Sequence, residues 1–308
     1  MNTTKTALIL GATGGAGGEI ATALLRRGWT VRALVRNAAR PGLDPRIDWH
    51  EGDAMRAAAD IDVLVHAVNP PGYRDWDKQV LPMLEHSLAA ARANAARLVL
   101  PGTVYNYGPD AFPLLAEDDP QQPLTRKGAI RVAMEQRLAE ATDVRSLILR
   151  CGDFFGPRAG NNWFAAMVKP GRPVRSLLYP GRHGLPHAWG YLPDVGETVA
   201  RLLERERELE RFARFHFAGH HVDEAALLAA MRRATGNAAL PLRAFPWWLT
   251  KLAAPFSVLL RELGEMRYLW REPLQLDNRR LRAWLGEEPR TPLDQAIEAT
   301  LRGLGCVA

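Results

Sequence analysis

Three glycines stand three residues apart near the start of the chain, at positions 11, 14 and 17. Glycine has no Cβ atom, so its backbone can turn sharply and approach a ligand closely. Where a strand precedes such glycines and a helix follows them, the backbone N–H groups of the turn can bind a pyrophosphate. The pattern predicts a dinucleotide-binding turn, and its candidate residues are Gly11, Thr13, Gly14, Gly15, Ala16 and Gly17.

The flanking sequence supplies the elements that must position this turn. Residues 6–10 are apolar and β-prone, and they precede the first glycine. Residues 19–28 place apolar side chains on one helical face and end at a glycine, which is typical of a helix terminus. A β-prone segment over residues 30–35 follows, so we expect a strand–helix–strand unit.

The end of the second predicted strand indicates which dinucleotide is bound. Folds that bind NAD usually carry an acidic residue there to hold the ribose 2′-hydroxyl, whereas an arginine accommodates the 2′-phosphate of NADP. Here the strand ends in Val35-Arg36-Asn37 and offers no acid. We therefore expect NADP(H) in preference to NAD(H). Arg36 is the expected ligand of the 2′-phosphate, and Arg32 is expected to help it. The alternative for each is an exposed surface arginine.

The N-terminal Gly-Ala-Thr-Gly-x-x-Gly followed by Val-Arg-Ala-Leu-Val-Arg resembles the extended and atypical short-chain dehydrogenase/reductase superfamily, which includes epimerase/dehydratase-like and NmrA-like proteins. Further matches run in register almost to the end of the chain. The resemblance implies an α/β fold, a Rossmann-type doubly wound parallel sheet with a smaller, mostly helical C-terminal lobe. It assigns residues 1–157 to the NADP-binding domain, to which residues 189–218 return, and residues 158–308 to the substrate-binding lobe.

The same resemblance suggests further cofactor contacts. Gly52-Asp53 closes the predicted third strand, where the family's aspartate contacts the adenine. The fourth strand runs to His66-Ala67, so Ala67 and Asn69 are expected at the cofactor-facing edge. His66 titrates near neutrality as a free side chain, but the resemblance favours a role in packing and cofactor contact over catalysis.

The catalytic pattern of the family is altered in this chain. Extended members carry a Ser or Thr after the fifth strand and then Tyr-x-x-x-Lys on a helix. Thr103 falls on the Ser/Thr position. Alignment from Pro123 and from Glu135 places Lys127 where the family has Tyr and Arg131 where it has Lys.

This replacement decides what chemistry is open to the site. Arg131 can donate hydrogen bonds to a ribose or phosphate but does not give up its proton. Lys127 can act as an acid or base if burial and the charge of Arg131 depress its pKa; the alternative is a solvated helix residue. Tyr105 and Tyr107 are the other candidate proton donors, and both follow the fifth strand.

The second half of the chain is richer in tryptophan and should cover the substrate. Asn162 and Trp163 follow the sixth strand closely, so they either contact a ligand or belong to an ordered loop with Trp163 in the core. Residues 245–260 are strongly apolar but interrupted by Lys251 and Pro255. They are interpreted as a lid on an apolar substrate, as lobe core or a homodimer contact, or as a membrane-surface element.

Composition excludes several other classes of protein. Forty basic and 34 acidic residues give a net charge of +6, but the arginines are dispersed and interleaved with acids, so we expect no nucleic-acid partner. Two cysteines provide no disulfide framework, and the histidines show no metal-ligand pattern. No apolar run is long enough to span a bilayer, so we expect a cytoplasmic protein that is not an integral membrane protein.

Two classes of function remain. The first is an NADPH-dependent reductase that transfers hydride to a carbonyl or activated double bond of a small, fairly apolar substrate, with Lys127, Thr103, Tyr105 and Tyr107 as catalytic candidates. The second is a non-catalytic NADP(H)-binding sensor or regulator that resembles NmrA, in which the missing tyrosine marks lost catalysis. A nucleotide-sugar epimerase or dehydratase is disfavoured because those chemistries depend on that tyrosine.

Overall fold

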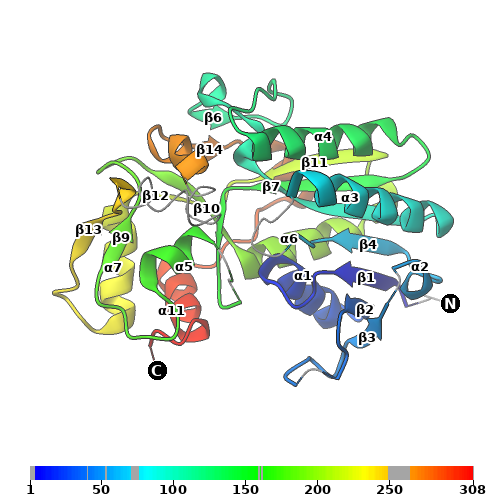
Figure 1. Ribbon diagram of the computed structural model, residues 1–308, viewed down its shortest axis with the longest axis horizontal. Coiled ribbons are helices and arrows are strands. Elements are labelled where there is room, and N and C mark those ends of the chain that lie inside the picture. The colour runs from blue at the N-terminus through cyan, green and yellow to red at the C-terminus, as the bar shows by residue number, and fades with distance from the viewer. Residues whose placement is uncertain are drawn as a thin grey trace.

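The computed structural model describes residues 4–39, 41–52, 54–70, 76–158, 160, 162–248 and 264–307. Its centre is a seven-stranded parallel sheet with the strand order β11-β7-β5-β4-β1-β2-β3 (Figure 1). The strands are β1 (Thr6–Leu10), β2 (Thr30–Val35), β3 (Asp48–Glu51), β4 (Val63–His66), β5 (Arg97–Thr103), β7 (Ser146–Cys151) and β11 (Phe212–Phe217). The predicted Rossmann-type α/β fold is confirmed.

Helices cover both faces of the sheet because successive strand residues point in opposite directions and both directions are apolar. On one face, Ile9, Val65 and Leu149 pack with helices α1 (Gly15–Arg26) and α6 (Leu192–Glu204). On the other face, Leu8, Leu64 and Ile148 pack with α3 (Trp76–Ala93) and α4 (Arg126–Glu140). The short helix α2 (Ala54–Ala57) also contributes to this second face.

The order in which the chain adds strands to the sheet reverses at β1, which pairs with β2 on one side and with β4 on the other. Connections leave the two neighbours on opposite faces, so a crevice opens beyond the carboxyl ends of β1 and β4. The glycine turn, the segment after β4, the segment after β5 and the start of α4 all follow this edge in the chain. The topology therefore brings most of the candidate residues to one side of the molecule.

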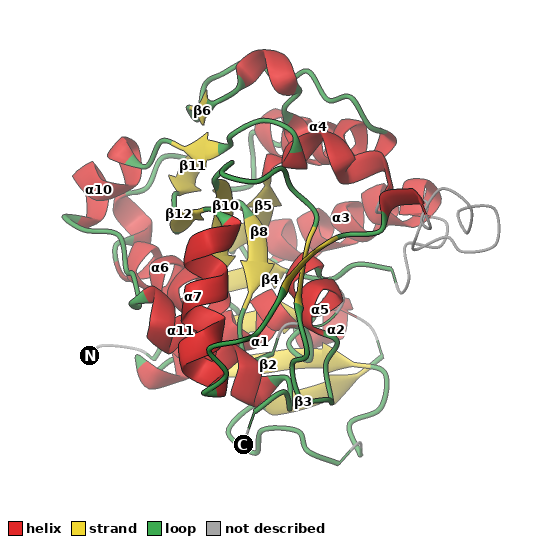
Figure 2. Cartoon of the chain, turned by 90° about the vertical axis from the view of Figure 1, so that its left-hand side faces the viewer, coloured by secondary structure: helices red, strands yellow, loops and turns green. Residues whose placement is uncertain are grey.

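The smaller lobe contains helices and several short sheets (Figure 2). Helices α7 (Glu224–Thr235) and α11 (Leu293–Gly303) lie side by side, with α5 (Trp163–Val168) nearby. The sheets are β8-β10-β12, β9-β13 and β6-β14. Their strands are β6 (Leu114–Leu115), β8 (Asp153–Phe155), β9 (Leu177–Tyr179), β10 (His187–Tyr191), β12 (His220–Val222), β13 (Leu242–Ala244) and β14 (Gln275–Leu276).

The chain passes between the two regions several times. After β10 it returns to the large sheet through α6 and β11, and β11 pairs with β7 along its full length. Helix α10 (Arg279–Leu285) then packs Leu281 and Trp284 against the same core. At the contact between α1 and α6, a Cβ on Gly196 would lie 2.6 Å from the carbonyl oxygen of Glu19, so only glycine permits this approach.

Part of the apolar segment 245–260 lies outside the described residues, which resume at residue 264. At its start, Phe245 and Trp247 pack against the aromatic core of the smaller lobe, with their rings 4.9 Å apart. Within the described ranges, no helix is both long enough and apolar enough to cross a membrane.

Candidate functional site

The glycine turn between β1 and α1 has the close contacts that its sequence predicts. Gly11 has a φ of +90°, and a Cβ there would lie 2.3 Å from the carbonyl oxygen of Ala67 at the end of β4. A Cβ on Gly17 would lie 2.4 Å from the carbonyl oxygen of Gly11. The first glycine thus lets two strand ends meet, and the last lets α1 begin directly against the turn.

The outer side of this turn is open and suited to a pyrophosphate. Thr13 and Gly14 are exposed, and Gly14 precedes the first residue of α1 without any side chain that caps the helix. The first N–H groups of a helix lack partners within the helix and attract anions. Gly15 and Ala16 form the start of α1, so the turn fits the phosphate-binding role expected of it.

A second group of predicted cofactor residues lies after β2 and β3. Arg36 directly follows β2 and is exposed. Glu51 ends β3 in register with Val35, and its carboxylate accepts a hydrogen bond from the backbone N–H of Ala38. Glu51 therefore orders the loop that carries Arg36. Asp53 lies outside the described residues.

An arginine that the sequence analysis did not assign connects the smaller lobe to α1. Arg158 follows β8, and its Nη1 donates to the carbonyl of Gly18 and to Oγ1 of Thr22, each at 2.9 Å. Its Nε lies 3.7 Å from the Glu19 carboxylate. Nothing in the local sequence distinguishes this arginine, because its partners are more than a hundred residues away.

Helix α4 presents the two candidate residues Lys127 and Arg131, together with Glu135, on a single face. Lys127, Arg131 and Glu135 are spaced four residues apart, so their side chains stack along one side of the helix. Lys127 is only 5% exposed and Glu135 only 4%. This face packs toward the carboxyl edge of the sheet, and Arg131 between the two buried residues is partly exposed.

Each of the first two positions lies near a different strand end. Arg131 Nη2 is 3.4 Å from Asn69 Oδ1 beyond β4, and its guanidinium is 5.4 Å from the centre of the Trp76 ring. Lys127 lies in the first turn of α4, beside Gly128. A Cβ on Gly128 would be 2.2 Å from the carbonyl oxygen of Tyr105, so glycine allows the start of the helix to contact the segment after β5.

That segment contains the other catalytic candidates. Thr103 ends β5, and its Oγ1 accepts the backbone N–H of Tyr105 at 2.9 Å, which caps a short 3₁₀ helix over Val104–Asn106. Tyr105 is partly buried, and its hydroxyl donates to Oδ1 of Asp153 at 3.2 Å. The structure thus brings Thr103, Tyr105 and the Lys127 end of α4 together.

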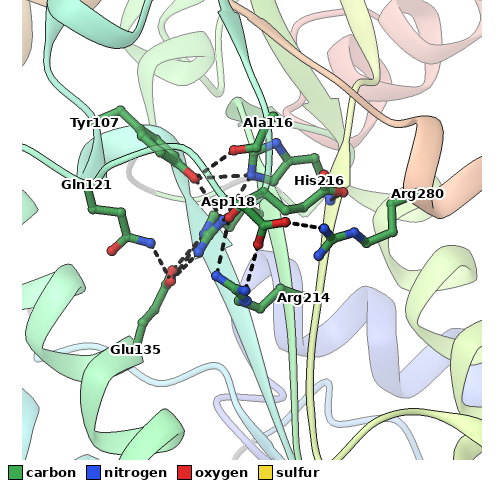
Figure 3. Close-up of polar contacts among 10 residues, drawn as sticks. Tyr107, Ala116, Asp118, Gln121, Glu135, Arg214, His216 and Arg280 are labelled. Carbon is green, nitrogen blue, oxygen red and sulfur yellow. Dashed lines mark hydrogen bonds and ion pairs between the residues drawn. The ribbon is translucent and has the colours of Figure 1, made fainter.

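Tyr107, by contrast, takes part in a buried polar network (Figure 3). Its side chain has no exposure, and its hydroxyl accepts a hydrogen bond from Arg150 Nη1 at 2.8 Å. His216 Nε2 lies 3.3 Å from the same hydroxyl. Burial raises the pKa of Tyr107 strongly. The burial of Tyr107 and its contacts in this network favour a structural role over that of the proton donor that the sequence suggested.

The centre of this network is a buried ion pair between β7 and α4. Arg150 has no exposure, and its Nη2 donates to Glu135 Oε2 at 2.6 Å while its Nε donates to Oε1 at 3.0 Å. Its Nη1 also donates to the Glu117 carbonyl at 3.0 Å. Gln121 donates to Glu135 at 3.0 Å. These contacts fix the depth and rotation of α4, and with them the positions of its two candidate residues.

Two histidines are held neutral beside arginines. Burial, followed by the charge of Arg131, lowers the pKa of His66 to about 3, and its Nδ1 lies 2.8 Å from Ser87 Oγ. Burial, followed by the charge of Arg150, lowers the pKa of His216 to about 3. Neither imidazole is a base near neutrality. For His66 this agrees with the preference for packing over catalysis.

A polar chain missed by the sequence analysis extends from Tyr105 into the smaller lobe. Asp153 Oδ2 lies 2.8 Å from His187 Nε2, and both side chains are buried. The His187 ring stacks on Trp270 with centroids 3.9 Å apart and planes 14° apart. Asp153 stands just after β7, a position where ligands often bind, but His187 has no comparable signal in the sequence.

The predicted substrate residues take structural positions. Asn162 caps α5, and its Oδ1 accepts the backbone N–H of Ala165 at 2.8 Å. Trp163 is 3% exposed and packs its ring 5.3 Å from that of Trp270. Asn162 therefore acts as a helix cap, and Trp163 belongs to the aromatic core of the smaller lobe. Among the described residues, no three His, Cys, Asp or Glu side chains are grouped to hold a metal ion.

Comparison with known proteins gives a family for this arrangement. Residues 7–215 match the model of the NAD dependent epimerase/dehydratase family. A 3-diazoavenalumate denitrifying reductase from Streptomyces sp is 30% identical over 174 residues, which cover 50% of this chain and 57% of that protein. A dTDP-6-deoxy-L-talose 4-dehydrogenase (NAD(P)(+)) from Kitasatospora kifunensis is 32% identical over 165 residues, 48% of this chain and 52% of that protein.

These matches differ in extent. The chain spans little more than half the length of the two curated relatives that it matches. The crystal structure of the Bordetella bronchiseptica enzyme WbmH in complex with NAD⁺ covers 98% of this chain and 99% of its own, with a TM-score of 0.73 and 19% identity. At that identity the likeness supports the fold alone.

The ion pair that fixes α4 can be tested by unfolding. Glu135→Gln leaves the Arg150 guanidinium buried without its counter-charge, and breaking a buried pair in this way costs about 3–5 kcal/mol. The control Glu85→Gln, on α3, removes the exposed ion-pair partner of Arg137, which lies on α4 as Glu135 does. This change should cost less than about 1 kcal/mol. Urea denaturation measures both losses. Equal small losses would contradict the anchoring role.

The neutral histidines predict a dependence of stability on pH. Since their pKa values are lowered to about 3 in the fold, only the unfolded chain takes up these protons below about pH 6.5. The free energy of unfolding should therefore fall as pH decreases, by up to about 1.4 kcal/mol per pH unit for each histidine. His66→Gln should reduce this slope in urea titrations between about pH 6 and 5. The control His86→Gln, on an exposed residue of α3, should leave it unchanged.

Proposed function

The chain belongs to the NAD dependent epimerase/dehydratase family, and from this membership we propose that it is an NADPH-dependent reductase acting on a carbonyl or activated double bond of a small molecule. The family and the NAD⁺ bound in WbmH support a nicotinamide dinucleotide as the cofactor class. The observation that carries the proposal is that one face of α4 holds Lys127 in a buried position and Arg131 in a partly buried one. The resemblance to the family assigns these two positions to catalysis.

The chain's own residues account for binding. The open N-terminus of α1 would hold the pyrophosphate, and Arg36 would hold the 2′-phosphate after β2. Arg131 would donate to the ribose from the position next to Asn69. When bound, the cofactor supplies a hydride. Arg131 keeps its proton throughout, so proton transfer falls to other groups.

Three side chains would manage the substrate oxygen. Lys127 would hold a proton on Nζ and stabilise negative charge that develops on this oxygen. Thr103 uses its Oγ1 lone pair for the Tyr105 N–H, which leaves its hydroxyl hydrogen to orient the substrate. Tyr105 is the alternative proton donor, since its hydroxyl is linked to Asp153 and is not locked in the Arg150 network.

Turnover distinguishes this proposal from a sensor. The purified protein should oxidise NADPH with at least one member of a panel of aldehydes, ketones, enones and quinones. Lys127→Met should lower kcat by about a hundredfold or more, because acid–base groups contribute roughly 10²–10⁴-fold, and should leave NADPH binding intact. NADPH binding without oxidation by any acceptor would support the NmrA-like sensor. Full turnover by Lys127→Met would remove that lysine from the mechanism.

The preference for NADPH rests on Arg36 and has its own test. Arg36→Ala should weaken NADPH binding by about tenfold or more, because a hydrogen bond to a charged group contributes about 1.5–3 kcal/mol. NADH binding should stay unchanged, since NADH lacks the 2′-phosphate. Isothermal titration with both nucleotides measures the difference, and Arg92→Ala on the far end of α3 serves as a control. Equal affinities for NADH and NADPH in the unsubstituted protein would contradict the assignment.

A further inference from the structure

A cavity of about 200 Å³ in the smaller lobe is lined by three arginines and two tryptophans. We call it the arginine pocket, and its defining residues are Arg182, Arg267, Arg271, Trp247 and Trp270. The three guanidinium groups come from two separate segments of the chain, one after β9 and one before β14. The fold therefore brings them together, and their proximity is not a consequence of a local run of charge.

These arginines lack the partners that other arginines of the protein have. Elsewhere in the protein, Arg233 and Arg279 each pair with an aspartate, at 2.6 Å and 2.5 Å. Within the described part of the chain, none of the three pocket arginines forms an ion pair with a carboxylate. Like charges around one cavity repel, and a bound anion would offset this repulsion.

The walls suit a flat, apolar body. The Arg267 guanidinium lies 5.2 Å from the centre of the Trp247 ring, so the ring orients one of the three cations. Trp270 forms part of the lining as well, and its buried indole N–H has no acceptor among the described residues. A ligand with a ring and one acidic group would meet both features of the lining.

Three buried side chains connect the arginine pocket to the candidate catalytic residue Tyr105. Trp270 stacks on His187 at 3.9 Å, His187 lies 2.8 Å from Asp153, and Asp153 accepts from the Tyr105 hydroxyl at 3.2 Å. A ligand in contact with Trp270 would thus be separated from Tyr105 by His187 and Asp153. This adjacency relates the pocket to the substrate crevice.

We propose that the arginine pocket binds the acidic group of a small aromatic substrate, a carboxylate or phosphate monoester, with the ring against the tryptophans. The inference rests on the proposed function in treating this ligand as the substrate. Ligand pockets for drug-sized molecules hold about 300–1,000 Å³, so a cavity of about 200 Å³ fits one ring and its acidic group. The proposal thereby refines the expected substrate from a fairly apolar molecule to an aromatic molecule that carries one acidic group.

Binding of simple probes tests this without turnover. Benzoate and phenyl phosphate should bind in isothermal titration, and cyclohexanecarboxylate and inorganic phosphate should bind at least about tenfold more weakly, because they lack either the flat ring or the apolar body. Arg182→Gln and Arg271→Gln should each weaken benzoate binding by about tenfold. Both residues are exposed, so both variants should fold. Arg243→Gln, on the exposed surface of β13, is the matched control.

Several results would overturn the proposal. Inorganic phosphate binding as tightly as phenyl phosphate would leave an anion site without a ring, and uridine diphosphate binding more tightly than either aromatic probe would assign the pocket to a nucleotide. Equal benzoate affinity in Arg271→Gln and Arg243→Gln would contradict the role of the arginines. NADPH affinity, measured in the same samples, should be unchanged in every variant, so loss of the proposed function and loss of the pocket's role are separately visible.

Discussion

The buried ion pair between Arg150 and Glu135 is the contact on which the arrangement of the site depends. It joins the end of β7 to the third turn of α4, and both side chains are shielded from solvent. Burial disfavours the charged guanidinium, but the hydrogen bonds and the charge of Glu135 outweigh this and raise the pKa of Arg150. Because a buried pair of this kind has few alternative geometries, α4 has a fixed rotation, and Lys127 and Arg131 must face the strand ends.

Glycines allow the close backbone contacts that the arrangement of the site also requires. Gly17 lets α1 start against the phosphate-binding turn, and Gly128 lets α4 start against the carbonyl of Tyr105. At both places a Cβ would lie closer than 2.5 Å to a backbone oxygen. The polar anchor at Glu135 and the glycine contact at Gly128 are two turns apart on one helix, and together they determine where the intervening Arg131 lies.

Sequence reasoning recovers what is encoded locally. The glycine turn follows from spacing, and the order of residues alone is enough to place Lys127 and Arg131 on one face of α4. The order of residues does not distinguish Tyr105 from Tyr107, because both follow β5. Their different surroundings come from residues on other strands: Tyr107 accepts from Arg150, whereas Tyr105 donates to Asp153. Likewise, His187, Arg158 and the arginine pocket depend on contacts between segments far apart in the chain.

The exchange of Tyr-x-x-x-Lys for Lys-x-x-x-Arg changes the electrostatics of the crevice as well as its proton chemistry. Where the family pattern has one cation, this chain has two, a turn apart, of which Lys127 is buried and Arg131 partly exposed. Two cations beside a reacting oxygen favour developing negative charge on that oxygen. The Tyr105 hydroxyl offers a further polar group at the edge of the crevice, and its partner Asp153 in turn contacts His187.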